Sequence, residues 1–362
     1  MTTSQKNILV VLSILACILL LAVGYYGIQA YQFYASRPLG PALPVSTPLS
    51  LPATWTATVG TPLSAATLVP TPQPLCGGPK VMNILAIGMD RYGDTDIIRV
   101  VRVDFVTPKV AVLEFPRDLW VKIPYIADNQ NGLDHAKLNM AYFFGTPEKH
   151  YWDDPSGGQG LLSLTLDINF GVKADHYAVV DMHTFEQVVD AVGGVDINIT
   201  DLQTVYNTGK PLGKHHLNGA DALTLARHRN EGVFARASNQ NLVLCALRKK
   251  LLSPNVVTQI PGLINSFKDN IQTDFTPEQL GQLACLGTKL PLENIAFSSF
   301  PEELFKQSRI KPDPYFGNPN GTFVWDVDFN ILREYVTRFN AGTWPGHSTT
   351  TPTEDDSSSY CP

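Results

Sequence analysis

Two aspartates have the type and spacing of a metal site. Asp90 and Asp96 lie six positions apart, with Gly93 between them, just after an apolar stretch. This spacing allows both carboxylates to contact one Mg²⁺, which takes few protein ligands and fills its remaining positions with water and substrate oxygens. The alternative is a turn in which the aspartates accept hydrogen bonds from backbone NH groups, since turns also favour Asp and Gly. The spacing predicts Asp90 and Asp96 as candidate metal ligands.

Four arginines and a glutamine form a candidate anion site. Arginine presents a planar fork of donors that matches phosphate oxygens, whereas isolated surface salt bridges are the alternative for each arginine. Two of the arginines are two positions apart and would share one face of an extended segment, and another lies four positions before the glutamine, on one face of a helix. The five residues are Arg117, Arg227, Arg229, Arg236 and Gln240. Their positions at the ends of expected elements predict a surface that binds a diphosphate.

Other kinds of chemistry have little support. His215, His216 and His228 have no carboxylate or cysteine at ligand spacing, so we expect exposed or packing histidines. The sequence has no G-x-S-x-G, no Walker-type loop and no G-x-G-x-x-G, so serine hydrolases and the usual nucleotide sites are not indicated. The formal net charge of -6 over 362 residues argues against a nucleic-acid partner.

The N-terminus predicts a membrane anchor. Ile8 to Ile28 contains no charged residue and is long enough to cross the hydrocarbon core of a bilayer. A cleaved signal peptide is the alternative, although its apolar core is usually shorter. We expect a single-pass protein of the cell membrane, with a cytoplasmic stub and transmembrane anchor over 1–31 and the rest of the chain outside the cytoplasm.

A proline-rich linker, a large domain and a tail are expected after the anchor. Residues 32–79 are rich in Pro, Ser and Thr, a composition that favours extended backbone and could hold the domain up to roughly 120 Å from the membrane. Residues 80–343 are enough for one substantial core, and we expect the motif-bearing part to be 80–252. Residues 344–362 are polar and predict a disordered tail.

The cysteines allow several arrangements. Outside the anchor, which contains Cys17, the cysteines are Cys76, Cys245, Cys285 and Cys361. Three pairings are possible. One of them joins Cys245 to Cys285 and Cys76 to Cys361, and four buried free thiols are the alternative.

The elements that must position these residues follow an α/β pattern. Residues 81–87 predict a strand buried on both faces, and residues 97–105 and 109–115 predict a hairpin. Residues 177–180, a helix ended by Gly193 and Gly194, and residues 195–199 predict one strand-helix-strand crossover unit of a sheet. Further helices are expected over 161–170, 219–226, 238–252 and, from a capping box at Thr276, up to residue 286. A strand at 324–327 and a helix around 332–339 complete the domain.

An ordered series of motifs resembles the LytR-CpsA-Psr family of membrane-anchored cell-wall enzymes. The series comprises Asn83-Ile-Leu-x-Ile-Gly-x-Asp90, Thr95-Asp96, Pro116-Arg117-Asp118, Lys137-Leu-Asn139-x-Ala-Tyr142, Val189-Asp-Ala-Val-Gly-Gly-Val195, His216-Leu-Asn-Gly-x-x-Ala-Leu223, Ala226-Arg-x-Arg229 and Phe234-x-Arg236-x-x-x-Gln240. Each motif alone is weak, but their common order is specific.

The resemblance implies a mixed central β-sheet flanked by helices, with an apolar pocket for a polyprenyl chain. It also implies an Mg²⁺-dependent phosphotransferase that moves a glycopolymer from a polyprenyl-pyrophosphate carrier onto peptidoglycan or another wall acceptor. Asp90 and Asp96 would then hold the metal, and Arg117, Arg227, Arg229, Arg236 and Gln240 would bind the pyrophosphate. Either aspartate is a candidate for activating the acceptor hydroxyl.

This chain departs from the family pattern in several places. The loop between Asp90 and Asp96 is shorter, Asn239 and Asn241 flank the glutamine where arginine and glutamine are common, and Val233 replaces a frequent aspartate. Two alternatives therefore stay open: a pyrophosphatase that acts on the same lipid without an acceptor, and a non-catalytic surface protein that binds lipid or glycan.

Overall fold

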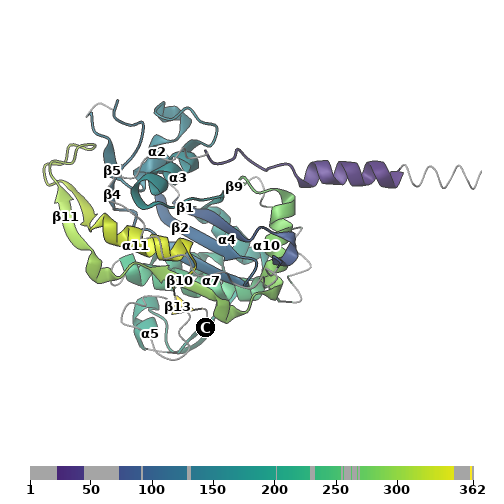
Figure 1. Cartoon of the computed structure of the whole chain (residues 1–362). Helices are drawn as coiled ribbons and strands as arrows, with labels where there is room; N and C mark the ends of the chain where they lie inside the picture. Colours follow the sequence, from purple (N-terminus) through teal and green to yellow (C-terminus); the bar gives the residue numbers. More distant parts are fainter. Residues whose placement is uncertain are drawn as a thin grey trace, which may run out of the picture.

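A seven-stranded mixed sheet forms the centre of the protein in the computed structural model (Figure 1). The structure describes residues 23–44, 73–90, 93–128, 132–200, 202–228, 233–253, 270–345 and 359–360, together with residues 256, 262 and 267. The strand order is β13-β10-β3-β2-β1-β6-β9. The strands are β1 (Val81–Met89), β2 (Thr95–Asp104), β3 (Lys109–Glu114), β6 (His176–Asp181), β9 (Ile271–Thr273), β10 (Ile295–Ser299) and β13 (Ser359–Tyr360).

Antiparallel and parallel pairs both occur in this sheet. β2 pairs antiparallel with β1 and β3, as the predicted hairpin requires, whereas β6 runs parallel to β1 and β10 runs parallel to β3. β1 and β2 lie in the middle of the sheet and carry apolar side chains on both faces; the sequence of β1 is nearly continuously apolar, whereas Arg99 and Arg102 interrupt that of β2. The predicted mixed sheet is therefore present.

Helices cover both faces. On one face, α2 (Met140–Phe144), α3 (Gly157–Phe170) and α11 (Phe329–Asn340) pack on a core that includes Leu85, Ile98 and Val100. The other face is covered by α4 (Met182–Ala191), α6 (Gly219–Arg227), α7 (Val233–Leu251) and α10 (Pro277–Lys289). The capping box predicted at Thr276 is confirmed: Thr276 and Gln279 exchange hydrogen bonds at the start of α10.

Three two-stranded ribbons lie outside the main sheet. They are β4 (Trp120–Lys122) with β5 (His135–Lys137), β7 (Val195–Ile199) with β8 (Gly213–Leu217), and β11 (Lys306–Ile310) with β12 (Thr322–Asp326). The sequence predicted that β7 would continue the sheet after β6 and α4. This prediction is wrong, because β7 pairs only with β8 among the described strands. The remaining elements are α5 (Leu202–Thr208) and the short 3-10 turns η1 (Leu75–Gly77), η2 (Pro147–Lys149), η3 (Leu292–Asn294) and η4 (Glu302–Leu304).

The segment before the domain is a helix followed by a strap, residues 36–44, which docks on the domain. Residues 23–35 are helical and project away from the domain (Figure 1). The NH of Leu39 then donates to the carbonyl of Phe275, and Leu43 packs on the main core. These linker residues thus contact the domain rather than acting as a free spacer. Most of the predicted anchor lies outside the described residues, and no described helix is long and apolar enough to cross a membrane.

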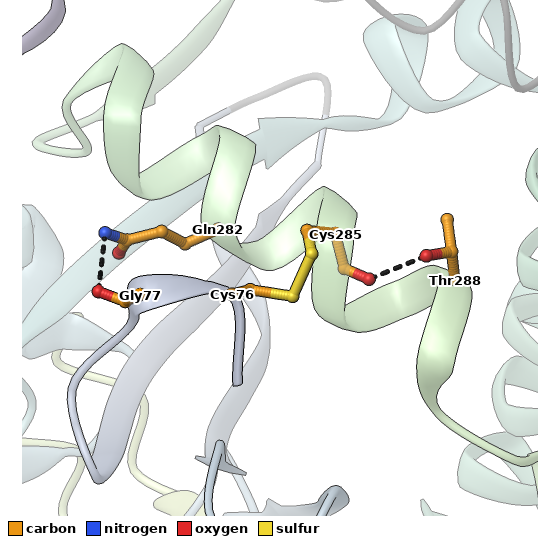
Figure 2. Close-up of a disulfide and its surroundings, with 5 residues drawn as sticks. All are labelled: Cys76, Gly77, Gln282, Cys285 and Thr288. Atoms are coloured by element: carbon orange, nitrogen blue, oxygen red, sulfur yellow. Dashed lines mark hydrogen bonds between the residues drawn. A yellow bond between two sulfur atoms is a disulfide. The ribbon is translucent and has the colours of Figure 1, made fainter. Parts of the chain in front are cut away.

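A disulfide ties the start of the domain to α10. Cys76 in η1 bonds to Cys285, and Gln282 of the same helix donates to the carbonyl of Gly77 (Figure 2). This bond excludes the pairing of Cys245 with Cys285 and of Cys76 with Cys361. Cys245 is disulfide-bonded as well, so the alternative of four free thiols is also wrong.

Candidate functional site

Three strand ends meet at one edge of the sheet. Met89, the last residue of β1, pairs with Thr95 at the start of β2. The NH of Phe115, just past β3, donates to the carbonyl of Ile98 in β2. The residues that follow β1 and β3 and those that begin β2 therefore gather at this edge. Asp90, Asp96 and Arg117 are the predicted site residues in these positions.

An ion pair joins two of these predicted residues. Nη1 of Arg117 contacts Oδ1 of Asp96, and Nε of Arg117 lies 3.5 Å from Oδ2 of Asp118. The side chains of Arg117 and Asp96 are 25% and 11% exposed, so the pair is partly shielded from water. Arg117 is therefore held against the carboxylates at the sheet edge.

Asp90 closes the turn between β1 and β2. Its Oδ1 accepts from the NH of Asp94 at 2.9 Å, and its own NH donates to the Asp94 carbonyl at 2.9 Å. One carboxylate oxygen thus caps the turn, as the alternative to a metal site predicted. Among the residues that the structure describes, no three His, Cys, Asp or Glu side chains form a group that could hold a metal. The two aspartates remain candidate ligands, because Mg²⁺ binds through as few as one or two carboxylates.

A largely apolar cavity of about 460 Å³ lies between the sheet and the helices α4, α6 and α7. Val243, Leu244 and Leu247 line it from one face of α7, while Ala86, Gly88 and Ile97 line it from the sheet. The polar residues of its wall are few: Asp96, Arg99, Asp181, Arg227 and Gln240. Such a combination of an apolar interior with a few polar groups is typical of ligand sites.

Helices α6 and α7 bring two predicted residues to this cavity. Arg227 is the last residue of α6 and is exposed, whereas Gln240 of α7 is buried. Nε2 of Gln240 donates to the carbonyl of Ala226 at 3.3 Å, which links the two helices at the end of α6. The prediction of an extended segment is wrong for Arg227, which is helical. Arg229 lies outside the described residues.

Arg236 shares α7 with Gln240, as the four-residue spacing predicted. The structure describes only the backbone of Arg236. Of the seven predicted residues, Asp96, Arg227 and Gln240 therefore line the cavity, and Arg117 is paired to Asp96. Asp90 lies beside them in the turn that precedes β2.

Sequence reasoning missed a buried arginine in the cavity wall. Arg99 in β2 is 4% exposed and donates to Glu114 of β3 and to Oε1 of Gln240. A signal was available, because a charged residue within a strand buried on both faces needs a buried partner. Glu114, in the expected neighbouring strand, is such a partner.

Other motif residues position the site without lining the cavity. Nζ of Lys137 lies 2.8 Å from Oδ1 of Asp118, and the NH of Asn139 donates to the carbonyl of Arg117. The ribbon of β4 and β5 thereby holds the backbone and the neighbour of Arg117. The Lys137-Leu-Asn139 motif therefore has a structural role at this site.

The motifs around α4 and α6 set the packing of these two helices. Oδ1 of Asp190 accepts from the NH of Gly219, and Asn218 caps α6 by accepting from the NH of Asp221. Gly219 lies so close to α4 that an added Cβ would meet the Glu186 carbonyl oxygen at 2.2 Å. This contact fixes where α6 runs and hence where Arg227 lies.

His215 and His216 belong to surface pairs rather than to the cavity. Nδ1 of His216 lies 2.8 Å from Oδ1 of Asp196, and both side chains are exposed. This hydrogen bond lowers the pKa of the Asp196 carboxyl. His215 contacts the carbonyl of Pro211.

Comparison with known families and sequences gives consistent matches. The model of the LytR_cpsA_psr family matches residues 76–333. The "Regulatory protein MsrR" of Staphylococcus aureus (strain COL) is 32% identical over 202 residues, which are 53% of this chain and 56% of that protein. The "Polyisoprenyl-teichoic acid--peptidoglycan teichoic acid transferase TagU" of Oceanobacillus iheyensis is 31% identical over 209 residues, 56% of this chain and 61% of that protein. The chain thus spans little more than half the length of these relatives.

Solved structures share the fold. TagV of B. subtilis superposes with a TM-score of 0.54 at 23% identity, covering 74% of this chain and 99% of that chain. The structure described as "TagT bound to LIIa-WTA" gives a TM-score of 0.55 at 17% identity, covering 76% of this chain and 98% of that chain. At these identities the likeness establishes the architecture alone.

Proposed function

The chain belongs to the LytR-CpsA-Psr family, and from this premise we propose that it transfers a glycopolymer from a polyprenyl-pyrophosphate carrier onto a cell-wall acceptor such as peptidoglycan. One observation carries the proposal. An apolar cavity of about 460 Å³ has Asp96, Arg227 and Gln240 in its wall, and Arg117 is paired to Asp96. A lipid diphosphate has the same division, with an apolar chain and an anionic head.

The names of two similar proteins support this substrate class. The relative from Oceanobacillus iheyensis is named a polyisoprenyl-teichoic acid–peptidoglycan teichoic acid transferase. The structure with a matching fold is described as TagT bound to LIIa-WTA. Carried to this chain, these names favour an isoprenoid-linked wall polymer as substrate.

The proposed reaction is a phosphoryl transfer. A hydroxyl oxygen of the acceptor attacks the phosphorus that bears the glycan, a new P–O bond forms, and the bond to the bridging oxygen breaks. The polyprenyl phosphate leaves with the negative charge of that oxygen, and the hydroxyl proton passes to a base. Asp90 and Asp96 are the candidate bases at the sheet edge.

The arginines act on the charge of the reacting groups. Fixed guanidinium donors stabilise negative charge that develops on the phosphates, which is a large contribution to phosphoryl transfer. The locations of Arg227 at the cavity wall and of Arg117 beside Asp96 support this role. We propose the same role for Arg229 and Arg236, and Gln240 would add an amide donor.

Mg²⁺ is part of the proposal. Asp90 follows β1 and Asp96 lies at the start of β2, which supports a shared site, because hard cations prefer carboxylate oxygen ligands. When bound there, Mg²⁺ would neutralise charge on the diphosphate. Arg117 and Asp118 would keep the Asp96 carboxylate oriented.

We further propose a membrane-anchored protein whose catalytic domain lies outside the cytoplasm. The uncharged stretch from Ile8 to Ile28 supports an anchor, and the helix over residues 23–35 carries exposed Tyr25, Tyr26, Tyr31 and Tyr34, residues typical of membrane interfaces. The Cys76–Cys285 disulfide fits an oxidising compartment.

The function can be tested with the full chain in detergent micelles. The assay contains Mg²⁺, a polyprenyl-diphosphate-linked oligosaccharide and peptidoglycan fragments, and mass spectrometry follows polyprenyl phosphate and glycosylated acceptor. We expect both products in equal amounts, and chelation by EDTA should abolish them. Arg117→Ala should lower the rate by roughly 10²- to 10³-fold, because it removes a fixed donor.

Arg309→Ala is the matched control, since Arg309 lies on the β11–β12 ribbon and donates to the Asn320 and Gly321 carbonyls. Its turnover should equal that of the wild type. Release of polyprenyl phosphate without glycosylated acceptor would identify a pyrophosphatase instead. Lipid binding without turnover would identify a non-catalytic binding protein.

A further inference from the structure

Arg99 is a charged residue in the wall of the apolar cavity. It lies in β2 and is 4% exposed, and it pairs directly across the sheet with Glu114 of β3, which is 8% exposed. Burying an arginine in such a place is unfavourable unless its charge and its N–H groups find partners. Each N–H donor of the buried guanidinium is therefore expected to have a hydrogen-bond partner.

Only part of the guanidinium is used. Nε and Nη2 of Arg99 donate to Oε2 of Glu114 at 3.0 and 2.6 Å, and Nη2 also lies 2.9 Å from Oε1 of Gln240. Nη1 is buried and has no hydrogen-bond partner among the residues that the structure describes. The guanidinium is planar and has five N–H donors. Glu114 contacts its Nε–Nη2 edge. Both N–H groups of Nη2 are therefore used, and those of Nη1 are the unused donors.

The unused Nη1 group belongs to a residue in the same wall as the predicted anion-binding residues. Gln240 contacts Arg99 through Oε1 and the Ala226 carbonyl through Nε2. Ala226 is followed by Arg227, and all four residues line the cavity. Gln240 thus connects Arg99 to the end of α6, where Arg227 lies.

We propose that Nη1 of Arg99 donates to oxygens of the phosphate attached to the lipid chain. This rests on the proposed function and adds a residue to it. Arg99 follows Asp96 by three residues along β2, about 10 Å at the rise of a strand, which places it deeper among the apolar side chains. A phosphate at this depth is the one that carries the chain.

The geometry explains why both a charge and unused donors are present. Charge-assisted N–H···O bonds from a guanidinium to a phosphate are roughly twice as strong as bonds between neutral groups. In the transfer, this phosphate leaves with the lipid and gains the negative charge of the broken bond. Arg99 would stabilise that charge, while Glu114 holds the guanidinium in place from its Nε–Nη2 edge.

Measurements of lipid binding test the phosphate-binding role of Arg99 independently of turnover. Farnesyl monophosphate and farnesol, which share the chain but not the phosphate, are titrated against the full-length protein in micelles. The test variant is Arg99→Gln combined with Glu114→Gln, because removing both charges leaves no unpaired buried ion. We expect it to bind farnesyl monophosphate at least tenfold more weakly than the wild type and to bind farnesol equally well.

Arg102→Gln is the matched control. Arg102 is a second buried arginine of β2, but it contacts the Asn340 carbonyl and Asp104 and does not line the cavity. This variant should bind both lipids like the wild type. The inference is overturned if the double variant keeps full affinity for farnesyl monophosphate, or if it loses both lipids equally.

The outcomes also separate the inference from the proposed function. If the wild type binds neither lipid, both are wrong. If the wild type transfers glycan and the double variant binds farnesyl monophosphate normally, the function stands and only the role of Arg99 fails. Arg99→Lys gives a further check, because an ammonium keeps the charge but lacks the planar fork. It should recover only part of the phosphate affinity.

Discussion

At the scale of single residues, the carboxylate of Asp96 has more than one interaction or proposed role. It forms an ion pair with Arg117 and lines the cavity, and we propose it as a metal ligand. A carboxylate has two oxygens and about four lone-pair sites, so one oxygen can hold Arg117 while the other binds a cation. We therefore propose that the ion pair presents Asp96 and Arg117 together to one substrate.

The residues at this site were predicted with different success for physical reasons. Arg117 comes just after β3 and Asp96 lies at the start of β2, and strand ends that share a sheet edge meet in space. Arg99 escaped notice because it lies inside a strand, where its apolar neighbours dominate the pattern. Its contact with Gln240 joins residues 141 positions apart, a separation that no local pattern encodes.

Tyr315 gives a prediction about alkaline stability. Its hydroxyl donates to the carbonyl of His135 at 2.8 Å, and burial, with smaller contributions from Tyr151 and Asp134, raises its pKa to about 12. The folded-state pKa thus exceeds the value of about 10 for an exposed tyrosine. The stability contributed by the protonated phenol is complete below pH about 10 and is lost as the pH rises toward 12.

Tyr315→Phe should therefore lower stability at neutral pH by about 1 kcal/mol, the typical worth of one hydrogen bond. Between pH 10 and 12 the wild type should lose more stability than the variant, because only the wild type has this group to ionise. Urea unfolding at a series of pH values measures both effects. Parallel loss in the two proteins would contradict the assignment.

At the scale of secondary-structure elements, the central hairpin was predictable and the β7–β8 ribbon was not recognised. β1 is almost continuously apolar, and β2 has adjacent apolar pairs at Ile97-Ile98 and Val100-Val101, as expected for strands covered on both faces. β7 alternates instead: Val195, Ile197 and Ile199 are buried, and the residues between them are exposed. Alternation indicates a strand with one solvated face, so the sequence did contain the information that β7 lies outside the central sheet.

The contact between α4 and α6 gives the prediction at this scale. Gly219→Ala would place a Cβ 2.2 Å from the Glu186 carbonyl oxygen, which forces the two helices apart. Overpacking of this kind costs about 1–3 kcal/mol, and α6 should carry Arg227 away from the cavity. Urea unfolding should show the loss of stability, and the transfer assay should show reduced turnover.

Gly281→Ala in α10 is the matched control. An added Cβ there meets nothing within 4 Å, and alanine is favoured over glycine inside a helix by about 0.5–1 kcal/mol. This variant should be slightly more stable than the wild type, with unchanged turnover. Equal effects of the two substitutions would mean that the close approach of α4 and α6 does not determine the position of α6.

At the scale of the whole molecule, the strap after the first helix connects that helix directly to the domain. The NH of Leu39 bonds to Phe275, and the Cα of Gly40 lies so near β9 that a Cβ would meet the Thr273 carbonyl oxygen at 2.6 Å. The composition of residues 32–79 suggested only extended backbone. Composition did not reveal the docking because the contacts are made by few residues and depend on a surface formed by distant strands.

The Cys76–Cys285 disulfide gives the prediction for the whole molecule. It joins residues 209 positions apart, so the loop that it closes contains β1 to β9 and all seven predicted site residues. Closing so long a loop restricts the unfolded chain strongly, by about 3–5 kcal/mol. Sequence alone could not choose this pairing, because loop closure does not distinguish among the three possibilities. The choice is made by η1 packing beside α10, where Gln282 also binds Gly77 (Figure 2).

Cys76→Ser combined with Cys285→Ser should therefore lower the free energy of unfolding by that amount and leave lipid binding intact, since neither cysteine lines the cavity. Urea unfolding of both proteins, with and without dithiothreitol, provides the measurement. Dithiothreitol should lower the stability of the double variant further, because Cys245 is also disulfide-bonded. A double variant as stable as the oxidised wild type would show that the packing of α10 alone holds η1 in place and that the covalent link adds nothing.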